Sequence, residues 1–417
     1  MKREKNMKKI KIEDFPKNKN NIFELIKNKS KIFMFGAGVI SEKTLISLNS
    51  IKFRGIFDNS KNLKNTIENN LKILDPQQIK KFNKNEIFII ITTTSFNDVI
   101  NQLESYGLKK NINFCISHIL KDQFVIEDIQ SINQNILFSS GSPVEKDNKL
   151  GGGIYRVEIN GDRWVTNKIY SGNCFGLIKN PIDNTIVFID TNKGILKYSE
   201  NFKLIKKINI EKGMRAHGIS FCKSTQTYAV ACSFQDKILI FDKNFNLTNQ
   251  FFITEKIKKI KIPQHHCNDC EISGESVYVS VFSVTGNWKK DVFDGGIIEF
   301  NSRTGKKIGS IKNDLWMPHN VRIINGTMHI LDSLRGNLLF DNLSIQGNFP
   351  AFTRGLDFKN GLYFVGQSRN RNFSKNLGVS KNISVDTGVV IFDPTTKISR
   401  FINVSNKISE IHSVLAL

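Results

Sequence analysis

A strand-rich unit recurs through the C-terminal two thirds of the sequence, and it limits the possible folds more than any other feature. Each copy begins with a short apolar strand, continues with a stronger strand ending in a small or acidic residue, and adds two more strands after Gly, Asn and Asp turns. The copies begin at Phe175, His217, Asn268, His319 and Arg354. A repeat of about 40–50 residues is typical of β-propellers, in which each copy forms one four-stranded blade.

Two incomplete pieces flank the five full copies. Ile136–Ser140 is a second strand with no first strand before it, and His412–Leu417 is a first strand with no blade after it. Together the two pieces supply one more blade, with the C-terminal strand closing the ring and leaving no open sheet edge. We therefore expect residues 136–417 to form an all-β six-bladed propeller closed by the C-terminal strand.

The first 120 residues follow a different pattern. Three apolar runs read as buried strands, at Lys31–Phe35, Phe53–Phe57 and Ile87–Ile91. Helical patterns follow the first and the third run, at Val39–Leu48 and Asn97–Tyr106. This order predicts an α/β Rossmann-like domain over residues 1–120, with a parallel sheet, and residues 121–135 as a linker to the propeller.

The turn after the first strand has the composition of a nucleotide site. Gly36 permits a tight turn, and Gly38 lets the backbone approach a phosphate at the N-terminus of the next helix. Asp58 is placed to accept hydrogen bonds from ribose hydroxyls, and Thr92 ends another strand at the same edge of the sheet. Ser41 replaces the third glycine of the usual motif, so a domain that has lost its ligand and serves for docking is the alternative.

Three segments of this region together resemble the N-terminal domain of bacterial sugar O-acyltransferases: Phe35–Gly38, Gly55–Asp58 and Ile89–Thr92. Similar domains precede some methyltransferases of surface-glycan clusters. The resemblance covers residues 31–118 and implies a nucleotide or nucleotide-sugar ligand, in a protein of surface-glycan metabolism. It does not imply acyltransferase activity, because the left-handed β-helix of those enzymes is absent from this sequence.

The propeller region resembles the six-bladed propellers of the gluconolactonase, strictosidine-synthase and NHL-repeat group. Pro318–Val321, Leu331–Ser333 and Arg354–Leu356 resemble more closely an uncharacterised bacterial propeller family, a domain of unknown function. The second resemblance covers residues 136–417. It implies a fold and no activity.

The first strand of each blade lines the central channel, so the residues that begin these strands should ring one mouth. The predicted ring consists of Phe175, His217, Asn268, His319, Arg354 and His412. Its three histidines lie two blades apart, which suits Zn²⁺ with an open fourth position. The arrangement is similar to that of the peptidyl-hydroxyglycine lyase propeller, which holds zinc with three histidines on alternate blades. The similarity stops there and brings no reaction with it.

Oxygen ligands are the alternative metal set. Asn268, Asp269 and Asp332 could bind Ca²⁺, as oxygen-rich sites do in gluconolactonase-like propellers, while Arg354 would suit an anionic substrate beside the metal. His265–Cys270 contains a further His-His-Cys-x-x-Cys signature for zinc, but it has no second Cys pair. Without a metal, the histidines of the ring would fill the channel and bond backbone groups and water.

The net charge of the chain bears on which molecules it can bind. The formal net charge is +22, but the lysines are spread along the whole sequence, which indicates a codon bias and does not favour nucleic acid as a partner. The sequence has no secretory signal and no apolar run of about 18 residues for a membrane span, so we expect a cytoplasmic protein.

Three classes of function fit these observations. The favoured one is a ligand-binding or scaffold protein, with a nucleotide or nucleotide-sugar in the first domain and a glycan, small molecule or partner at the propeller mouth. The second is a metal-dependent lyase or hydrolase using His217, His319 and His412. The third is a purely structural interaction module.

Overall fold

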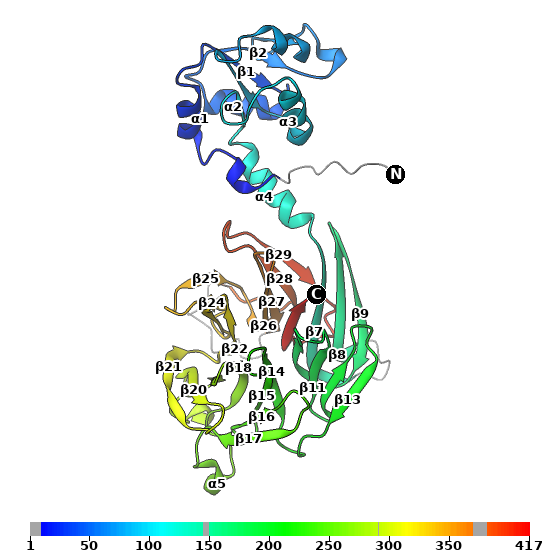
Figure 1. The fold of residues 1–417 in the computed structure, drawn as a ribbon, viewed down its shortest axis with the longest axis vertical. Coiled ribbons are helices and arrows are strands. Elements are labelled where there is room, and N and C mark those ends of the chain that lie inside the picture. The colour runs from blue at the N-terminus through cyan, green and yellow to red at the C-terminus, as the bar shows by residue number, and fades with distance from the viewer. Residues whose placement is uncertain (1–9, 145–149, 291, 370–381) are drawn as a thin grey trace. The chain divides into compact units, whose positions relative to one another are not determined.

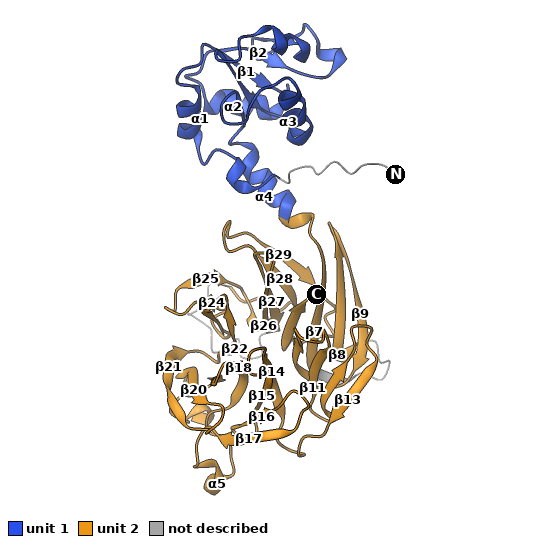
Figure 2. Cartoon of the chain, in the orientation of Figure 1, with its two compact units in different colours: residues 1–128 blue, residues 129–417 orange. Residues whose placement is uncertain are grey.

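The structure is a computed structural model that describes residues 10–144, 150–290, 292–369 and 382–417. The chain divides into two compact units, residues 1–128 and residues 129–417 (Figure 2).

The first unit is built on a six-stranded sheet of order β3-β4-β2-β1-β5-β6. Its strands are β1 (Lys31–Phe35), β2 (Phe53–Phe57), β3 (Ile67–Glu68), β4 (Leu71–Leu74), β5 (Ile87–Ile91) and β6 (Phe114–Ile116). Its helices are η1 (Ile12–Asp14), α1 (Lys19–Ile26), α2 (Val39–Ser47), η2 (Lys61–Leu63), η3 (Pro76–Lys81), α3 (Phe96–Ser105) and α4 (Leu120–Gln130). The central strands β1 and β5 are parallel, and β5 is buried along its whole length, as its unbroken apolar run predicts.

The second unit consists of six four-stranded sheets (Figure 1). Their strands are β10 (Cys174–Lys179), β11 (Ile186–Asp190), β12 (Gly194–Tyr198) and β13 (Leu204–Ile208); β14 (Ala216–Cys222), β15 (Thr227–Cys232), β16 (Lys237–Phe241) and β17 (Leu247–Phe252); β18 (Cys267–Ser273), β19 (Ser276–Val281), β20 (Gly295–Asn301) and β21 (Lys307–Leu315); β22 (His319–Ile324), β23 (Thr327–Asp332), β24 (Asn337–Leu339) and β25 (Ile345–Asn348); β26 (Phe352–Lys359), β27 (Leu362–Ser368), β28 (Gly388–Phe392) and β29 (Ser399–Asn403); and β30 (Ser413–Ala416), β7 (Asn133–Val144), β8 (Gly151–Asn160) and β9 (Arg163–Ser171). Two short helices, α5 (Ile257–Ile260) and η4 (Trp288–Lys290), lie in loops of this unit.

The order of strands within a blade follows from composition. The second strand β11 is apolar up to its last residue and is buried throughout, whereas the fourth strand β13 carries Lys206 and Lys207 and is mostly exposed. Apolar side chains of neighbouring blades form common clusters, as Ala229 and Ala231 of β15 do with Val279 of β19. The six-bladed propeller predicted from the repeats is confirmed.

The expected fold class, an α/β Rossmann-like domain followed by a propeller closed by the C-terminal strand, is wrong as a description of this chain. The chain is mostly β, with 45% strand and 15% helix. In the first unit, the segment from β2 to β5 holds η2, the hairpin β3-β4 and η3, where a Rossmann-like domain would place helical crossovers. Asn65, Asn69 and Asn70 of that segment have positive φ angles, which a helix interior does not tolerate.

The predicted closure of the ring by the C-terminal strand is also wrong, although the prediction that the two incomplete pieces form one blade is confirmed. Among the described strands, hydrogen-bonded ladders join strands within a sheet, and the six sheets of the propeller stay separate from one another. The C-terminal strand β30 pairs with β7 inside one blade, with Ser413 opposite Ser139 and Ala416 opposite Ile136. Apolar packing and side-chain bonds between blades therefore hold the ring together, and the strand completes one blade without forming a backbone ladder with the next.

The segment expected to be a linker has regular structure. Leu120–Gln130 forms helix α4, and Phe124 packs against the apolar core of the first unit. The first propeller strand, β7, begins at Asn133. Most of the segment thus contributes to the fold of the first unit.

Candidate functional site

The inner strands of the propeller present the candidate site at the points where they begin. In five blades the ladder between the first and second strand is irregular at the start of the inner strand, between Cys174 and Leu177, Ala216 and Gly218, Cys267 and Asp269, His319 and Val321, and Thr353 and Leu356. Bulges of this kind turn side chains out of the normal alternation and are common beside binding sites. Four of the six predicted ring residues lie inside these irregular stretches.

The structure brings the three predicted histidines together. The ring of His217 lies 5.2 Å from that of His412 and 6.2 Å from that of His319, measured between centroids. Phe175 contacts two of them, at 4.5 Å from His217 and 4.2 Å from His412. All three histidines are buried, with 4–8% of their surface exposed. Gly141 packs against this group so closely that a Cβ there would lie 2.7 Å from Nε2 of His412.

A fourth histidine joins the group. The ring of His266 lies 4.5 Å from Phe282 and 4.5 Å from Trp288, and Phe282 lies 5.1 Å from His319. The sequence pattern assigns His266 only to the His-His-Cys-x-x-Cys signature. Its repeat position gives a better signal, because it stands two residues before Asn268 as Arg215 stands two residues before His217.

The backbone is strained at three equivalent positions of this mouth. Arg215, His266 and Met317 have φ angles of 47°, 53° and 50°, and each stands two residues before a residue of the predicted ring. A left-handed conformation costs a residue with a side chain about 1–2 kcal/mol. Strain of this kind persists where the surrounding structure imposes it, and it clusters at functional sites.

The hydrogen bonds at the mouth fix the tautomers of two imidazoles. His412 Nε2 donates to a carboxylate oxygen of Glu410 at 3.0 Å, so its Nδ1 carries the lone pair, and that atom is buried without a partner among the described residues. His319 Nδ1 lies 3.0 Å from the Met317 carbonyl oxygen, which can only accept, so its Nε2 carries the lone pair. Both histidines therefore offer an acceptor.

Burial keeps all four imidazoles neutral. It lowers the pKa of His217 and His319 well below the usual value, the pKa of His412 to about 4 and the pKa of His266 to about 3. Neighbouring cationic groups act in the same direction, with Arg354 close to His319 and Arg215 close to His266. At neutral pH the group presents uncharged rings that accept hydrogen bonds.

Two guanidinium groups give the mouth its charge. Arg354 lies 3.4 Å from the Glu410 carboxylate and stacks over Phe352 at 4.6 Å. Arg215 lies over two rings, Phe175 at 5.3 Å and Phe234 at 4.8 Å. With two cations, one carboxylate and neutral histidines, these groups together carry one positive charge, and they favour an anion.

The predicted oxygen ligands are bonded within the protein. The Asn268 side chain donates to the Pro318 carbonyl oxygen at 2.9 Å and accepts from Ser280 at 2.7 Å. Asp332 accepts from the Trp316 backbone N–H at 2.6 Å and pairs with Arg335 at 3.0 Å. In the part of the chain that the structure describes, no group of three His, Cys, Asp or Glu side chains is placed to hold a metal ion.

Asp269 belongs to a buried cluster of charges further along the inner strands. Its carboxylate lies 2.8 Å from the Arg322 guanidinium, which also lies 3.8 Å from Glu271. Asp357 lies on β26, the inner strand after the one that carries Arg322, and it accepts a hydrogen bond from the Ala416 N–H at 2.7 Å. Burial raises the pKa of Asp269 and Asp357, and it raises that of Glu271 to about 7. The cluster joins neighbouring blades and has a structural role.

The pKa of Glu271 predicts a pH dependence of stability. Because its folded pKa of about 7 exceeds the ordinary value of 4.5, the folded state keeps a proton that the unfolded state releases. The stability that Glu271 contributes is full below pH 4.5 and is lost as the pH rises to 7. Glu271→Gln should remove this loss. The melting temperature of the variant minus that of wild type should therefore increase as the pH is raised from 5 to 8. Glu275→Gln, which alters an exposed ion pair with Arg303, is the control. The prediction is contradicted if the melting temperatures of Glu271→Gln and wild type change with pH in the same way.

The four residues of the predicted nucleotide site also lie together. Thr92 Oγ1 donates to the Gly36 carbonyl oxygen at 2.7 Å, and Asp58 accepts from the Ala37 N–H at 2.8 Å. The N–H of Gly38 lies 3.0 Å from Ser41 Oγ. These bonds stabilise the turn with the same groups that a nucleotide would use, so nucleotide binding stays a prediction without support from this geometry.

Both parts of the chain match known protein families. Residues 194–417 match the family described as "Domain of unknown function (DUF4915)", and residues 28–112 match the one described as "C2185-like, N-terminal". The second match does not support the expected resemblance to sugar O-acyltransferases. No curated protein matches the chain. No helix among the described residues is long and apolar enough to cross a membrane.

Solved structures similar to this chain include a protein of unknown function from Bacteroides caccae, with 14% identity and a TM-score of 0.48, covering 69% of this chain and 99% of that one. A putative gluconolactonase has 12% identity and a TM-score of 0.40, covering 56% and 78%. A calcium-binding protein, regucalcin, from Agrobacterium tumefaciens has 10% identity and a TM-score of 0.38, covering 56% and 72%.

Proposed function

The chain belongs to the DUF4915 family, and we propose that its propeller binds a small anionic molecule, of the class of sugar acids and sugar phosphates, at the channel mouth. The observation that carries this proposal is the group of neutral, buried imidazoles around His217 beside the guanidinium groups of Arg215 and Arg354.

Each kind of side chain in this group would contact a different part of such a ligand. The lone pairs of His319 Nε2 and His412 Nδ1 would accept hydrogen bonds from hydroxyl groups. The rings of Phe175 and Phe282 offer apolar faces to the carbon skeleton. Arg354 would pair with a carboxylate or phosphate, in exchange for part of its contact with Glu410.

The test is calorimetry with sugar phosphates and uronic acids, each compared with the neutral sugar. Arg354→Gln should weaken binding of the anionic ligand about 10–100-fold, because a charge-assisted hydrogen bond contributes about 1.5–3 kcal/mol. Binding of the neutral sugar should change little.

Arg303→Gln, which removes an exposed arginine far from any ring residue in sequence, should bind like wild type. The proposal fails if no anionic sugar binds, or if Arg354→Gln and Arg303→Gln have the same affinity.

A metal-dependent lyase or hydrolase is the second candidate. It requires the rings of His319 and His412, which lie 6.2 and 5.2 Å from that of His217, to move closer together, and Zn²⁺ would then bind the uncharged imidazoles. After incubation with Zn²⁺, elemental analysis should then find one ion per chain, and less in His217→Ala. A zinc content far below one ion per chain would exclude the metal-dependent enzyme and leave ligand binding as the proposed function.

A further inference from the structure

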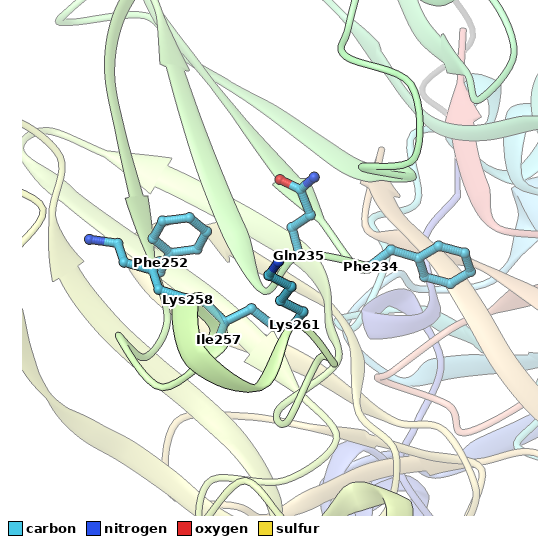
Figure 3. Close-up of a pocket in the computed structure, with 6 residues that line it drawn as sticks. All are labelled: Phe234, Gln235, Phe252, Ile257, Lys258 and Lys261. Atoms are coloured by element: carbon cyan, nitrogen blue, oxygen red, sulfur yellow. The ribbon is translucent and has the colours of Figure 1, made fainter.

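A cavity of about 300 Å³ lies beside helix α5, and one of its lining residues, Phe234, also lies under the Arg215 guanidinium of the mouth. Its lining residues are Phe234, Gln235, Phe252, Ile257, Lys258 and Lys261. Figure 3 shows Phe252 and Lys258 on one side and Phe234 on the other, with Ile257 and Lys261 between them. The cavity is thus lined by the aromatic ring of Phe252 and the aliphatic side chain of Ile257, while the Phe234 ring points away from them, and two lysines belong to its wall.

The surface around the cavity combines exposed apolar side chains with cations. Phe234 is 47% exposed, Ile260 47% and Ile262 50%, although each is large and apolar. Four lysines are exposed between them, Lys256, Lys258, Lys259 and Lys261. Glu255 is the one acidic residue of the segment 255–262, and it pairs with Lys258 at 2.5 Å. We call Phe234 and residues 256–262 the α5 patch.

We propose that the α5 patch docks the protein on an anionic lipid bilayer, a role beyond ligand binding at the mouth, with which the patch shares the contact between Phe234 and Arg215. The lysines would contact headgroup phosphates, while Ile260, Ile262 and Phe234 enter the boundary with the acyl chains. The apolar cavity would accept part of one acyl chain.

Two observations favour a bilayer over an acidic protein or a nucleic acid. Charge is complementary to an anionic surface, since the segment 255–262 holds four lysines and one glutamate. The exposed Ile260 and Ile262 stand directly beside these lysines, which is the composition of interfacial helices. A nucleic acid would use the lysines and leave the isoleucines in water. Figure 1 shows α5 projecting beyond the strands of the second unit, where a flat surface can reach it.

The experiment is sedimentation of the full chain with vesicles of phosphatidylcholine alone or with about 30% phosphatidylglycerol. We expect binding to the anionic vesicles and none to the neutral ones. Replacing Lys258, Lys259 and Lys261 together by Gln should weaken binding about 100-fold, because each lysine near an anionic surface strengthens it about fivefold. Ile260→Ser with Ile262→Ser should weaken it about tenfold while keeping the charge.

The control is the replacement of Lys203, Lys206 and Lys207 by Gln. These lysines lie in and beside β13, where Leu204 and Ile205 are 55% and 56% exposed, so charge and apolar exposure are matched, but they lie along a strand of a blade and not on the projecting helix beside the cavity. The control should bind like wild type. The proposal is overturned if anionic vesicles do not bind, if the control loses as much affinity as the α5 variant, or if the isoleucine variant binds vesicles like wild type, which would show a purely electrostatic attraction with no insertion into the bilayer.

Discussion

Deletion of Ser413–Leu417 is expected to unfold the propeller at physiological temperature. The deletion removes β30, whose residues pair with Ile136–Ser139 of β7, and it exposes the edge of that strand. Val414 is 4% exposed and belongs to a core cluster with Phe138 and Phe364. Loss of a whole strand and its buried side chains removes several of the roughly 5–15 kcal/mol by which a domain is typically stable.

Thermal denaturation followed by circular dichroism would measure this effect. Two point variants of the same strand calibrate it, because alternate residues face opposite sides of a sheet. Val414→Ser should lower the melting temperature markedly, and Leu415→Ser, at a partly exposed position, should lower it less. A truncated protein that melts at the wild-type temperature would show that β30 does not stabilise the propeller.

Arg322→Met should destabilise the propeller more than most single substitutions of its buried residues. Arg322 is the cation of the buried cluster, at 2.8 Å from Asp269 and 3.8 Å from Glu271. Without it, the buried Asp269 carboxylate must stay without a counter-charge or take up a proton. Breaking a buried ion pair by removing one partner costs about 3–5 kcal/mol.

Urea denaturation of single and double variants would test this explanation. The double variant Arg322→Met with Asp269→Asn should recover part of the loss, because the uncompensated carboxylate is then absent. If the double variant is as unstable as Arg322→Met alone, the loss comes from side-chain packing and the ion pair is not its cause.

The propeller could be predicted from the sequence because its signals are local. Alternating apolar residues, turns and a repeated order of strands define a blade without knowledge of its neighbours. The first unit was harder, because the segment between β2 and β5 contains few apolar residues and three asparagines in left-handed conformations. Such a segment gives no helical or strand period, so its hairpin and short helices could not be read from the sequence.

The positions of the mouth followed from repeat equivalence, but the partners of each side chain did not. Asp269 looks like an oxygen ligand in sequence, yet Arg322 of the next blade neutralises it. His266 was missed as a mouth residue because Cys267 and Cys270 complete a zinc signature, although its repeat position matches that of Arg215. Contacts between blades decide these roles, and a single repeat does not contain them.

The cavity beside α5 shows the same limit. Lys256–Lys261 reads as an alternating, exposed segment, and the four-residue helix that it contains depends on the surrounding loop. Phe234, on the other side of the cavity, comes from the turn between β15 and β16. Two segments that are distant in the pattern of strands therefore form one surface.

Substitution by glycine would have different consequences at the three left-handed residues of the mouth. Glycine adopts this conformation without the steric cost, so glycine at Arg215, His266 or Met317 would relieve the backbone strain there. Glycine at Met317 would keep the carbonyl group that holds His319, because that contact uses the backbone. Glycine at Arg215 or His266 would remove a guanidinium or an imidazole from the mouth. Relief of backbone strain and retention of the mouth's side chains would thus agree at one of these positions and conflict at the other two.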